Sequence, residues 1–473
     1  MRLLWTAMLV LLLAGVVFGP GLVSRTPKPD ETLVILSPHW DGIRAEYARG
    51  FEAYILRTKG KHVRVEWLDV GGTGEITKFI RELGRKANWG AGEGIGVDVL
   101  FGGGVFDYRN LTDEAALRKE NIECPGGLLL PHNVPTAGQI PAKGAGQDLK
   151  DAQGRWYAAC MSGFGIVYNR LVIEKAKLPM VEDWRTLSRP EYLGWVSCGD
   201  PVKSGSMHIC VEMILQAYKW DDGWGIFARM AANAKSFNEG GASVPRDVSL
   251  GQCAAGPCLD FYAAAPIRRQ GATHLEFLFP QDLSGVTADS IAVFRNAPHS
   301  ELAQDFEDFV LSEEGQRLWY QKRGSEGGPQ EFDLERLPVL PEIYKMDLPT
   351  FTTARPFAAN AAFVFDDPKS GKRWNTVNAL MRGALLDVHE DLKAAWEAVL
   401  KAGRAEDLGA ALGRPPLSEA QVDALVGKKY STAQYNALKQ KWSGWSRRRF
   451  DSIRAAARSG GAVPEFESAP TEP

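Results

Sequence analysis

The stretch Cys198-Gly-Asp-Pro-Val-Lys-Ser-Gly-Ser-Met-His-Ile-Cys210 links a predicted strand to a predicted helix at 209–218. The helix is indicated by apolar residues at helical spacing, which form one broad face. At its start Ser204 or Ser206 can act as the N-cap, and Gly205 lets a ligand approach the backbone. The free N–H groups, the helix dipole and the two hydroxyls together favour an anion. Taken alone, the stretch is more simply explained by a capped helix that binds nothing.

Before this stretch the chain alternates between strand and helix patterns. Short apolar strands are predicted at 33–36, 63–68 and 97–101, and helical spacing occupies 43–57 and 76–83. This order predicts an α/β fold with a parallel sheet, in which ligand groups collect at the carboxyl ends of the strands.

The glycine-rich turn at 71–74 opens one of these helices. It lacks the Lys-Ser or Lys-Thr pair that follows the glycines of a nucleotide P-loop, so that interpretation is rejected. What remains is a tight turn in which Thr73, followed by Gly74, either caps the helix or contacts an anion.

The second half of the chain contains further strands and then helices. Strands are predicted at 155–159 and 164–169, on either side of a turn, and 375–402 has the pattern of one long amphipathic helix. Capping boxes at 418–421 and 431–434 predict two more helix starts.

Length and charge limit the classes of function. With 473 residues the chain can form two or three domains with substantial cores. Its net charge of −3 provides no dominant positive field, so we expect no nucleic-acid partner. The clearest basic cluster, Arg447-Arg-Arg449, lies in a helical pattern and fits a solvated helix face.

The N-terminus has the layout of a secretory signal. Residues 3–18 are almost wholly apolar, Arg2 precedes them, and no charge follows until Arg25. The uncharged span is also long enough to cross a bilayer, although Gly19-Pro-Gly21 favours a signal. We therefore expect export, with residues 1–24 acting as a signal peptide or an N-terminal anchor.

Six cysteines are an even number in a chain expected to be exported, so both structural disulfides and buried free thiols fit. They are Cys124, Cys160, Cys198, Cys210, Cys253 and Cys258. Their spacing gives only a weak indication of zinc.

The order and spacing of segments between positions 33 and 316 resemble the periplasmic solute-binding proteins of ABC importers. The resemblance is to the type II, two-lobed branch that includes ferric-iron, phosphonate, polyamine and thiamine binders. The matching segments are 33–39, 65–74, 97–102, 154–157, 165–169, 200–206, 260–262, 297–299 and 309–316.

This resemblance implies two α/β lobes, joined by hinge strands, that close on a ligand. We expect the first part of lobe 1 at 31–158, lobe 2 at 159–264 and a return to lobe 1 at 265–330. A helical C-terminal extension would occupy 331–458, and the Gly-, Pro-, Ser- and Glu-rich tail at 459–473 is expected to be disordered.

In such proteins the loops after the strands line the ligand cleft. The resemblance selects as ligand contacts Ser37, His39, Thr73, Gly74, Tyr157, Ser204, Gly205, Ser206, Asp260 and Tyr262. Hydroxyls, helix starts, one imidazole and one carboxylate fit a small polar, anionic ligand. Structural alternatives remain for His39, Tyr157 and Tyr262, whereas Asp260 is costly to bury without a partner.

Iron is the alternative ligand that the resemblance raises. Ferric binders present two consecutive tyrosines where this chain has Phe261-Tyr262, and His39 falls where they have a histidine. If iron is bound directly, His39 and Tyr262 would hold it. Because Fe(III) prefers several anionic oxygens, we instead expect an oxyanion, an organic acid, a phosphonate-like compound or chelated iron, and no resident metal or cofactor.

The function that follows is capture of this ligand and its delivery to the transmembrane subunits of an ABC permease. The protein would lie in the periplasm or on the extracellular face, and would meet the membrane through the permease or an uncleaved N-terminal helix. A membrane-anchored sensor is the second hypothesis. An enzyme is not expected, because Ser206 and His208 do not share a helix face and no Gly-x-Ser-x-Gly elbow is present.

Overall fold

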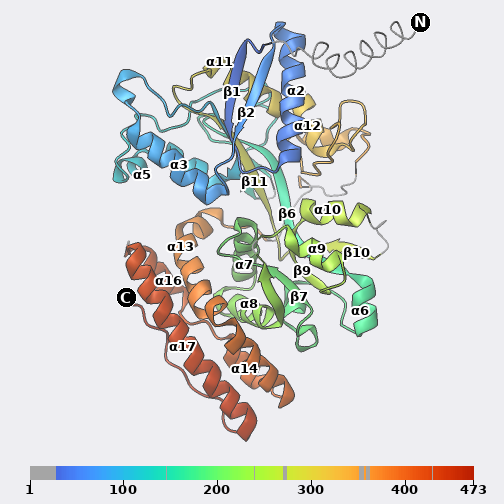
Figure 1. Ribbon diagram of the computed structural model, residues 1–473, viewed down its shortest axis with the longest axis vertical. Helices are drawn as coiled ribbons and strands as arrows, with labels where there is room; N and C mark the ends of the chain where they lie inside the picture. Colours follow the sequence, from blue (N-terminus) through green and yellow to red (C-terminus); the bar gives the residue numbers. More distant parts are fainter. Residues whose placement is uncertain are drawn as a thin grey trace, which may run out of the picture.

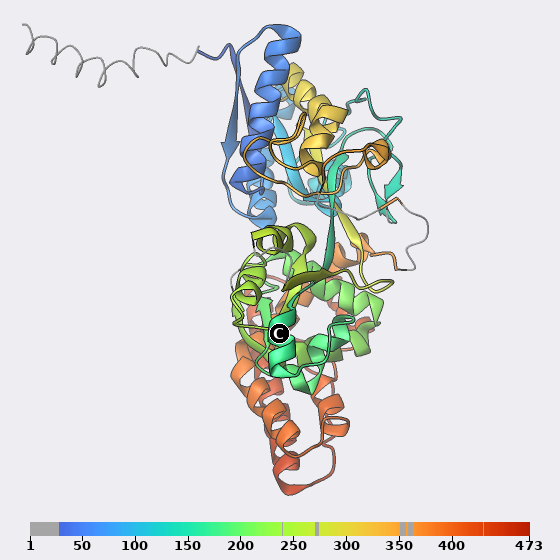
Figure 2. The same ribbon diagram turned by 90° about the vertical axis from the view of Figure 1, so that its right-hand side faces the viewer.

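The computed structural model describes residues 28–144, 146–238, 240–269, 274–350, 356–357, 363–428 and 430–473. These residues form two α/β lobes that follow one another along the long axis, with the C-terminal helices against the second lobe (Figure 1). The side view shows the same division (Figure 2). The expected signal peptide or anchor at 1–24 lies outside the described residues. Within the described residues, no helix combines the length and the apolar character needed to span a membrane.

Lobe 1 is built on three parallel strands in the order β2-β1-β3, with β11 antiparallel beside β3. The strands are β1 (Glu31–Leu36), β2 (Val63–Leu68), β3 (Val99–Gly104) and β11 (Val286–Val293). The helices are α2 (Asp41–Lys59), α3 (Thr73–Lys86), α4 (Val105–Thr112), α5 (Glu114–Lys119), α11 (Ser300–Leu311) and α12 (Glu313–Tyr320), with 3-10 turns η1 (Trp89–Ala91) and η4 (Pro341–Lys345). A small hairpin pairs β4 (Lys143–Gly144) with β5 (Gln147–Asp148). The predicted parallel α/β sheet is confirmed.

The two lobes share one long strand, β6 (Tyr157–Asn169), all of which is buried. Its first half pairs with β11 of lobe 1, and its second half pairs with β9 (Ala255–Leu259) and β10 (Leu275–Leu278) of lobe 2. The sequence predicts two strands and a turn here, because Ser162-Gly163 has turn composition. The structure keeps this segment extended, and Gly163 lets Asp260 and Phe279 approach its backbone closely.

Lobe 2 continues the sheet through β9, β7 and β8, which run parallel to one another. Its further strands are β7 (Val196–Gly199) and β8 (Ala234–Asn238). Its helices are α6 (Arg170–Ala176), α7 (Gly205–Ala217), α8 (Trp220–Asn233), α9 (Ser243–Ser249) and α10 (Asp260–Arg269), with 3-10 turns η2 (Trp184–Ser188) and η3 (Pro190–Tyr192). The stretch quoted first therefore connects β7 to α7, as predicted, and Ser204 is the N-cap.

The C-terminal extension is part of lobe 2, because a single hydrophobic core runs from Phe164 to Ala469. Its helices are α13 (Asp367–Ala384), α14 (His389–Lys401), α15 (Asp407–Gly413), α16 (Glu419–Val426) and α17 (Thr432–Ser459), with the 3-10 turn η5 (Leu386–Val388). Both predicted capping boxes form, at Ser418 and at Ser431. The long helix expected at 375–402 is instead divided into α13 and α14 by η5.

The lobe boundaries differ from the expected ones at two places. Leu275, expected in the return to lobe 1, is wholly buried in the lobe 2 core. Residues 334–343, expected in the extension, belong to the lobe 1 core, and Leu337 pairs with Met161 of β6. The reason is the same in both cases: a short segment pairs with a hinge strand, and this pairing is invisible to local patterns.

The tail expected to be disordered packs along α17. Ala469 is buried, and its N–H donates to the carbonyl of Pro416 at 2.8 Å. The indole N–H groups of Trp442 and Trp445 donate to the carbonyls of Pro470 and Glu467. Indole donors on the helix thus hold a segment whose composition alone indicates no structure.

All six cysteines are buried free thiols. Burial raises the pKa of Cys198 to about 12 and that of Cys253 to about 11. The sequence allows either disulfides or buried free thiols, and the structure has free thiols.

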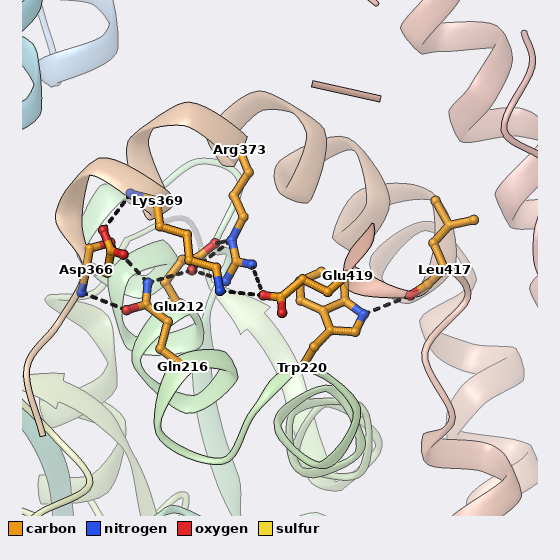
Figure 3. A network of polar contacts seen from close by, with 8 residues as sticks. All are labelled: Glu212, Gln216, Trp220, Asp366, Lys369, Arg373, Leu417 and Glu419. Carbon is orange, nitrogen blue, oxygen red and sulfur yellow. Dashed lines mark hydrogen bonds and ion pairs between the residues drawn. The ribbon is translucent and has the colours of Figure 1, made fainter. Parts of the chain in front are cut away.

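A buried ion pair joins the extension to lobe 2 (Figure 3). Arg373 of α13 donates to both carboxylate oxygens of Glu212 on α7, at 2.6 and 2.9 Å, and both side chains are at most 1% exposed. Arg373 also reaches Glu419 at 2.7 Å, which Lys369 contacts at the same distance. Because both charges are desolvated, each depends on the other.

We predict that Glu212→Leu lowers the free energy of unfolding by about 3–5 kcal/mol, because it leaves the Arg373 guanidinium buried without its main partner. The double variant Glu212→Leu/Arg373→Met should lose far less. Urea unfolding of both variants measures this difference. As a control, Glu31→Gln breaks an exposed pair with Lys61 and should cost at most about 1 kcal/mol. Equal losses for the single and double variants would contradict the role given to this pair.

Candidate functional site

The loops after the parallel strands carry most of the predicted ligand contacts. In lobe 1, Ser37 and His39 follow β1, Thr73 and Gly74 follow β2, and Gly102–Gly104 closes β3. Since these strands are parallel, their carboxyl ends lie at one edge of the sheet. The corresponding edge of lobe 2 carries residues 200–206 after β7 and Asp260 after β9.

His39 lies in the buried part of this edge, 5% exposed. Its Nε2 is 3.5 Å from Oδ2 of Asp289 on β11, and Phe101 packs edge-on at 4.7 Å between ring centroids. Neither ring nitrogen has a hydrogen-bond partner among the described residues. Burial lowers the pKa of His39 in spite of Asp289, so the imidazole is neutral near pH 7.

The imidazole of His39 lies very close to the backbone of Gly102. A Cβ on Gly102, whose φ is +105°, would lie 2.8 Å from the imidazole, so only glycine fits there. Ser37 is wholly buried and its Oγ accepts the N–H of His39 at 3.1 Å. The hydroxyl of Ser37 thus supports the loop that carries His39.

Arg336 joins lobe 1, the hinge and lobe 2. Its Nη1 donates to Asp289 Oδ2 at 2.8 Å and to the hydroxyl of Ser162 on β6, and its guanidinium lies 3.7 Å over the ring of Phe261 on α10. The residue is 6% exposed, and its Nε has no hydrogen-bond partner among the described residues. Arg336 is absent from the ligand contacts predicted from the sequence, because it lies in the segment expected to form the extension.

Asp289 is the carboxylate at the centre of these contacts. Its Oδ1 accepts the N–H of Gly103 at 2.8 Å. Burial alone would raise the pKa of Asp289, but the charge of Arg336, with His39 and the Gly103 N–H, holds it well below its ordinary value. A signal for Asp289 did exist in the sequence, since it is a lone acid within an apolar strand, as Asp260 is within its own segment.

The same segment that carries Arg336 holds α10 through charges. Arg268 of α10 forms ion pairs with Asp333, at 3.6 Å, and with Glu335. Lobe 2 is therefore attached to lobe 1 beside the hinge strands as well as through them.

Asp260 and Tyr262 lie on the lobe 2 side of Arg336. Asp260 accepts the N–H groups of Gly163 and Phe261, each at 2.7 Å. Burial raises the pKa of Asp260 to about 6, against these hydrogen bonds and the charge of Arg336. Tyr262 packs on Phe261, with ring centroids 4.3 Å apart, and burial raises the pKa of its phenol.

Two other predicted contacts have different surroundings. Thr73 begins α3 next to Gly103, since a Cβ on that glycine would lie 3.2 Å from the Thr73 methyl group, and Gly74 is exposed to open space. Tyr157 is buried, and its hydroxyl donates to the carbonyl of His132 at 2.9 Å. Tyr157 therefore contributes to the lobe 1 core, the structural alternative open from the sequence.

The start of α7 forms a separate polar group. The hydroxyls of Ser204 and Ser206 are 3.0 Å apart, and Ser204 Oγ accepts the N–H groups of Met207 and Gly241 at 3.5 and 3.3 Å. Gly205 between them is exposed. The Met207 N–H is taken by the Ser204 cap, so the first-turn N–H groups left without an acceptor in the helix are those of Gly205 and Ser206, and this surface can receive an anion.

The structure thus brings His39, Asp260 and Tyr262 around Asp289 and Arg336. Thr73 lies beside Gly103, whose N–H donates to Asp289. Ser204, Gly205 and Ser206 make their contacts at the start of α7 instead. Among the described residues no group of three or more His, Cys, Asp or Glu side chains is arranged to hold a metal ion.

Residues 126–331 match the family model described as bacterial extracellular solute-binding protein. The phosphoglycerate transport regulatory protein PgtC of Salmonella typhimurium is 29% identical over 161 residues, which are 34% of this chain and 40% of that protein. A protein of Haemophilus influenzae is 23% identical over 190 residues, 53% of its length. The chain therefore spans about half or less of the curated relatives it matches.

Solved structures share the fold along most of their length. The periplasmic binding protein AfuA of Actinobacillus pleuropneumoniae, solved with fructose-6-phosphate bound, has a TM-score of 0.53 at 18% identity and covers 79% of this chain and 99% of its own. The apo ferric ion-binding protein A of Pasteurella haemolytica has a TM-score of 0.53 at 12% identity, with 74% and 96% covered. The resemblance inferred from the sequence is confirmed: residues 126–331 match the bacterial extracellular solute-binding proteins, and the chain has the two-lobed fold of the periplasmic binding proteins.

Proposed function

We propose that this protein is the solute-binding component of an ABC importer, which captures a small anionic ligand between its lobes and delivers it to a membrane permease. It would act in the periplasm or on the extracellular face. The observation that carries the proposal is the position of Arg336, whose contacts join the strand ends of lobe 1, the hinge and α10 of lobe 2. A group bound there is sensed by both lobes, as hinge closure requires.

Several features favour an anion as the ligand. Arg336 is a cation between the lobes, and the starts of α3 and α7, which form separate polar groups, would meet the same ligand with N–H groups and with the Thr73 and Ser206 hydroxyls. The relatives agree in kind: PgtC is named for phosphoglycerate transport, and AfuA was solved with fructose-6-phosphate. A phosphate ester is therefore the first class to test, followed by organic acids, phosphonates and ferric chelates.

Direct binding of ferric ion is disfavoured by charge. A bare Fe(III) held by His39 and Tyr262 would sit among groups that also surround the Arg336 guanidinium, and cations repel. Phe261 removes the second phenolate and instead stacks under Arg336. Purified protein that takes up Fe(III) with a tyrosinate colour, lost in Tyr262→Phe, would reverse this preference.

Nucleophilic catalysis by the α7 serines is also disfavoured. The Ser206 hydroxyl pairs with Ser204, and His208 Nδ1 pairs with Asn378 at 2.7 Å. His208 Nε2 has no hydrogen-bond partner among the described residues, so no serine is paired with this base.

We predict that Ser206→Ala weakens anion binding about tenfold or more, because a hydrogen bond to a charged group contributes about 1.5–3 kcal/mol. Its unfolding temperature without ligand should be nearly that of the wild type, since Ser204 remains as the N-cap. Ser204→Ala is the control for the cap and should lose about 1 kcal/mol of stability. Calorimetry and thermal unfolding measure the two effects.

The ligand for this test comes from a thermal-shift screen of phosphate, 3-phosphoglycerate, fructose 6-phosphate, citrate, ferric citrate, spermidine and amino acids. A ligand at a hundred times its Kd should stabilise the protein by about 2.7 kcal/mol. Stabilisation by spermidine alone would contradict an anionic ligand. Loss of stability in Ser206→Ala without any loss of affinity would assign Ser206 a structural role.

We also predict that anion affinity rises as pH falls from 7 to 5. Asp260 has a pKa of about 6, so it gains a proton in this range and a negative charge beside Arg336 disappears. In Asp260→Asn this contribution should be absent, and binding at pH 7 should be tighter than in the wild type. Calorimetric Kd values at both pH values test this, with the variant correcting for titration of the ligand itself. The same pH dependence in both proteins would contradict it.

A further inference from the structure

Helix α13 of the extension runs antiparallel to α7, and their side chains pair in reverse order. The side-chain pairs are Asp200 with Arg382 at 2.7 Å, His208 with Asn378 at 2.7 Å and Glu212 with Arg373 at 2.6 Å. In a fourth contact the backbone N–H of Asp366, the N-cap of α13, donates to the side-chain oxygen of Gln216 at 2.8 Å. Three of the four contacts involve α7 itself, and the first involves the turn before it. This register sets Trp374 beside the first turn of α7.

Trp374 is held in a fixed orientation. Its ring stacks on His208, with centroids 3.7 Å apart and an angle of 29°. With the amide of Asn378 oriented so that its oxygen accepts the indole N–H at 3.0 Å, the amide nitrogen donates to His208 Nδ1 and to the carbonyl of Pro201. Burial lowers the pKa of His208 to about 4, so the stacked imidazole is neutral at pH 7.

The ring of Trp374 borders the start of α7. Its edge lies 3.8 Å from the position that a Cβ on Gly205 would take. His208 beneath it is wholly buried, and its Nε2 has no hydrogen-bond partner within the described part of the chain, whereas Trp374 itself is only partly buried. An aromatic edge, two hydroxyls and the free N–H groups of a helix start thus adjoin one another.

On the basis of the proposed function, we propose that Trp374 is a specificity-determining residue whose ring forms one wall of the ligand site. It would make the site prefer anionic groups attached to a ring or hydrocarbon portion over inorganic anions. The anion contacts Ser206 and the N–H groups of α7, while the rest of the ligand packs on the indole. Trp374 lies outside residues 126–331, so the extension adds this wall to the region that the family model matches.

The start of α7 and the ring of Trp374 would recognise different parts of the ligand. The start of α7 attracts any anion, because its N–H groups and dipole recognise charge and not shape. An aromatic face contributes only when the ligand has apolar surface to place against it. Since Asn378 and His208 hold the ring in position before binding, little side-chain entropy is lost.

The test compares three probes with the same head group: inorganic phosphate, glycerol 3-phosphate and glucose 6-phosphate. In Trp374→Ala we expect the Kd of glucose 6-phosphate to rise about tenfold, as for loss of a matched apolar contact, and that of phosphate to change less than about twofold. Glycerol 3-phosphate should lie between them. Trp374→Phe keeps an aromatic face and should retain most of the preference.

Trp445→Ala is the matched control. Trp445 is another partly buried tryptophan of the extension, its indole N–H donates to the Glu467 carbonyl at 3.1 Å, and it lies on α17. This variant should leave all three Kd values unchanged. Thermal unfolding of each ligand-free variant verifies that α13 still packs on α7.

The outcomes separate the two proposals. If the wild type binds neither the three phosphate probes nor citrate, the proposed anion binding is wrong, and the role of Trp374 is wrong with it. If the wild type binds and Trp374→Ala weakens phosphate and glucose 6-phosphate equally, or neither, only the role of Trp374 is overturned. If Trp374→Ala does not fold, Trp374→Leu, which removes the aromatic face but keeps apolar volume, takes its place: a smaller preference for glucose 6-phosphate over phosphate supports the aromatic wall, and an unchanged preference overturns it.

Discussion

A single buried strand, β6, belongs to both lobes, and this constraint governs the site. Because every residue of β6 is buried, polar side chains near its middle need partners from elsewhere in the chain. The Ser162 hydroxyl accepts a hydrogen bond from Arg336, and the backbone N–H of Gly163 donates one to Asp260. The hydrogen bonds that complete the hinge are therefore made by the same residues that surround the proposed ligand position. The proposed binding position would therefore couple binding to the hinge through these shared groups.

The sequence predicted the layered architecture well, because buried parallel strands and capped helices leave strong local patterns. The strand around Leu33 and the capping boxes at Ser418 and Ser431 form as predicted. Local patterns failed where a distant partner decides the structure. Ser162-Gly163 has turn composition, yet pairing with β11 keeps it extended. The tail has the composition of a disordered segment, yet indole donors of α17 order it.

The predicted ligand contacts divide by the same principle. Strand ends are recognisable in sequence, so His39 and Asp260 could be selected, and the structure brings them around Asp289 and Arg336. Their charge partner could not be selected, because Arg336 lies 47 positions beyond Asp289 in a segment without regular structure. Tyr157 shows the structural alternative: its residue type suits a ligand, but its hydroxyl donates to the His132 carbonyl.

The shared core of lobe 2 and the extension has a consequence for how the chain folds. Lobe 1 has all its core residues once the chain reaches Ile343, whereas the lobe 2 core closes only with Ala469, near the end. During synthesis from the N-terminus, the apolar faces of α7 and α8 therefore stay exposed until the C-terminal helices are available to pack on them. Closing so long a loop costs entropy before contacts repay it, which slows folding.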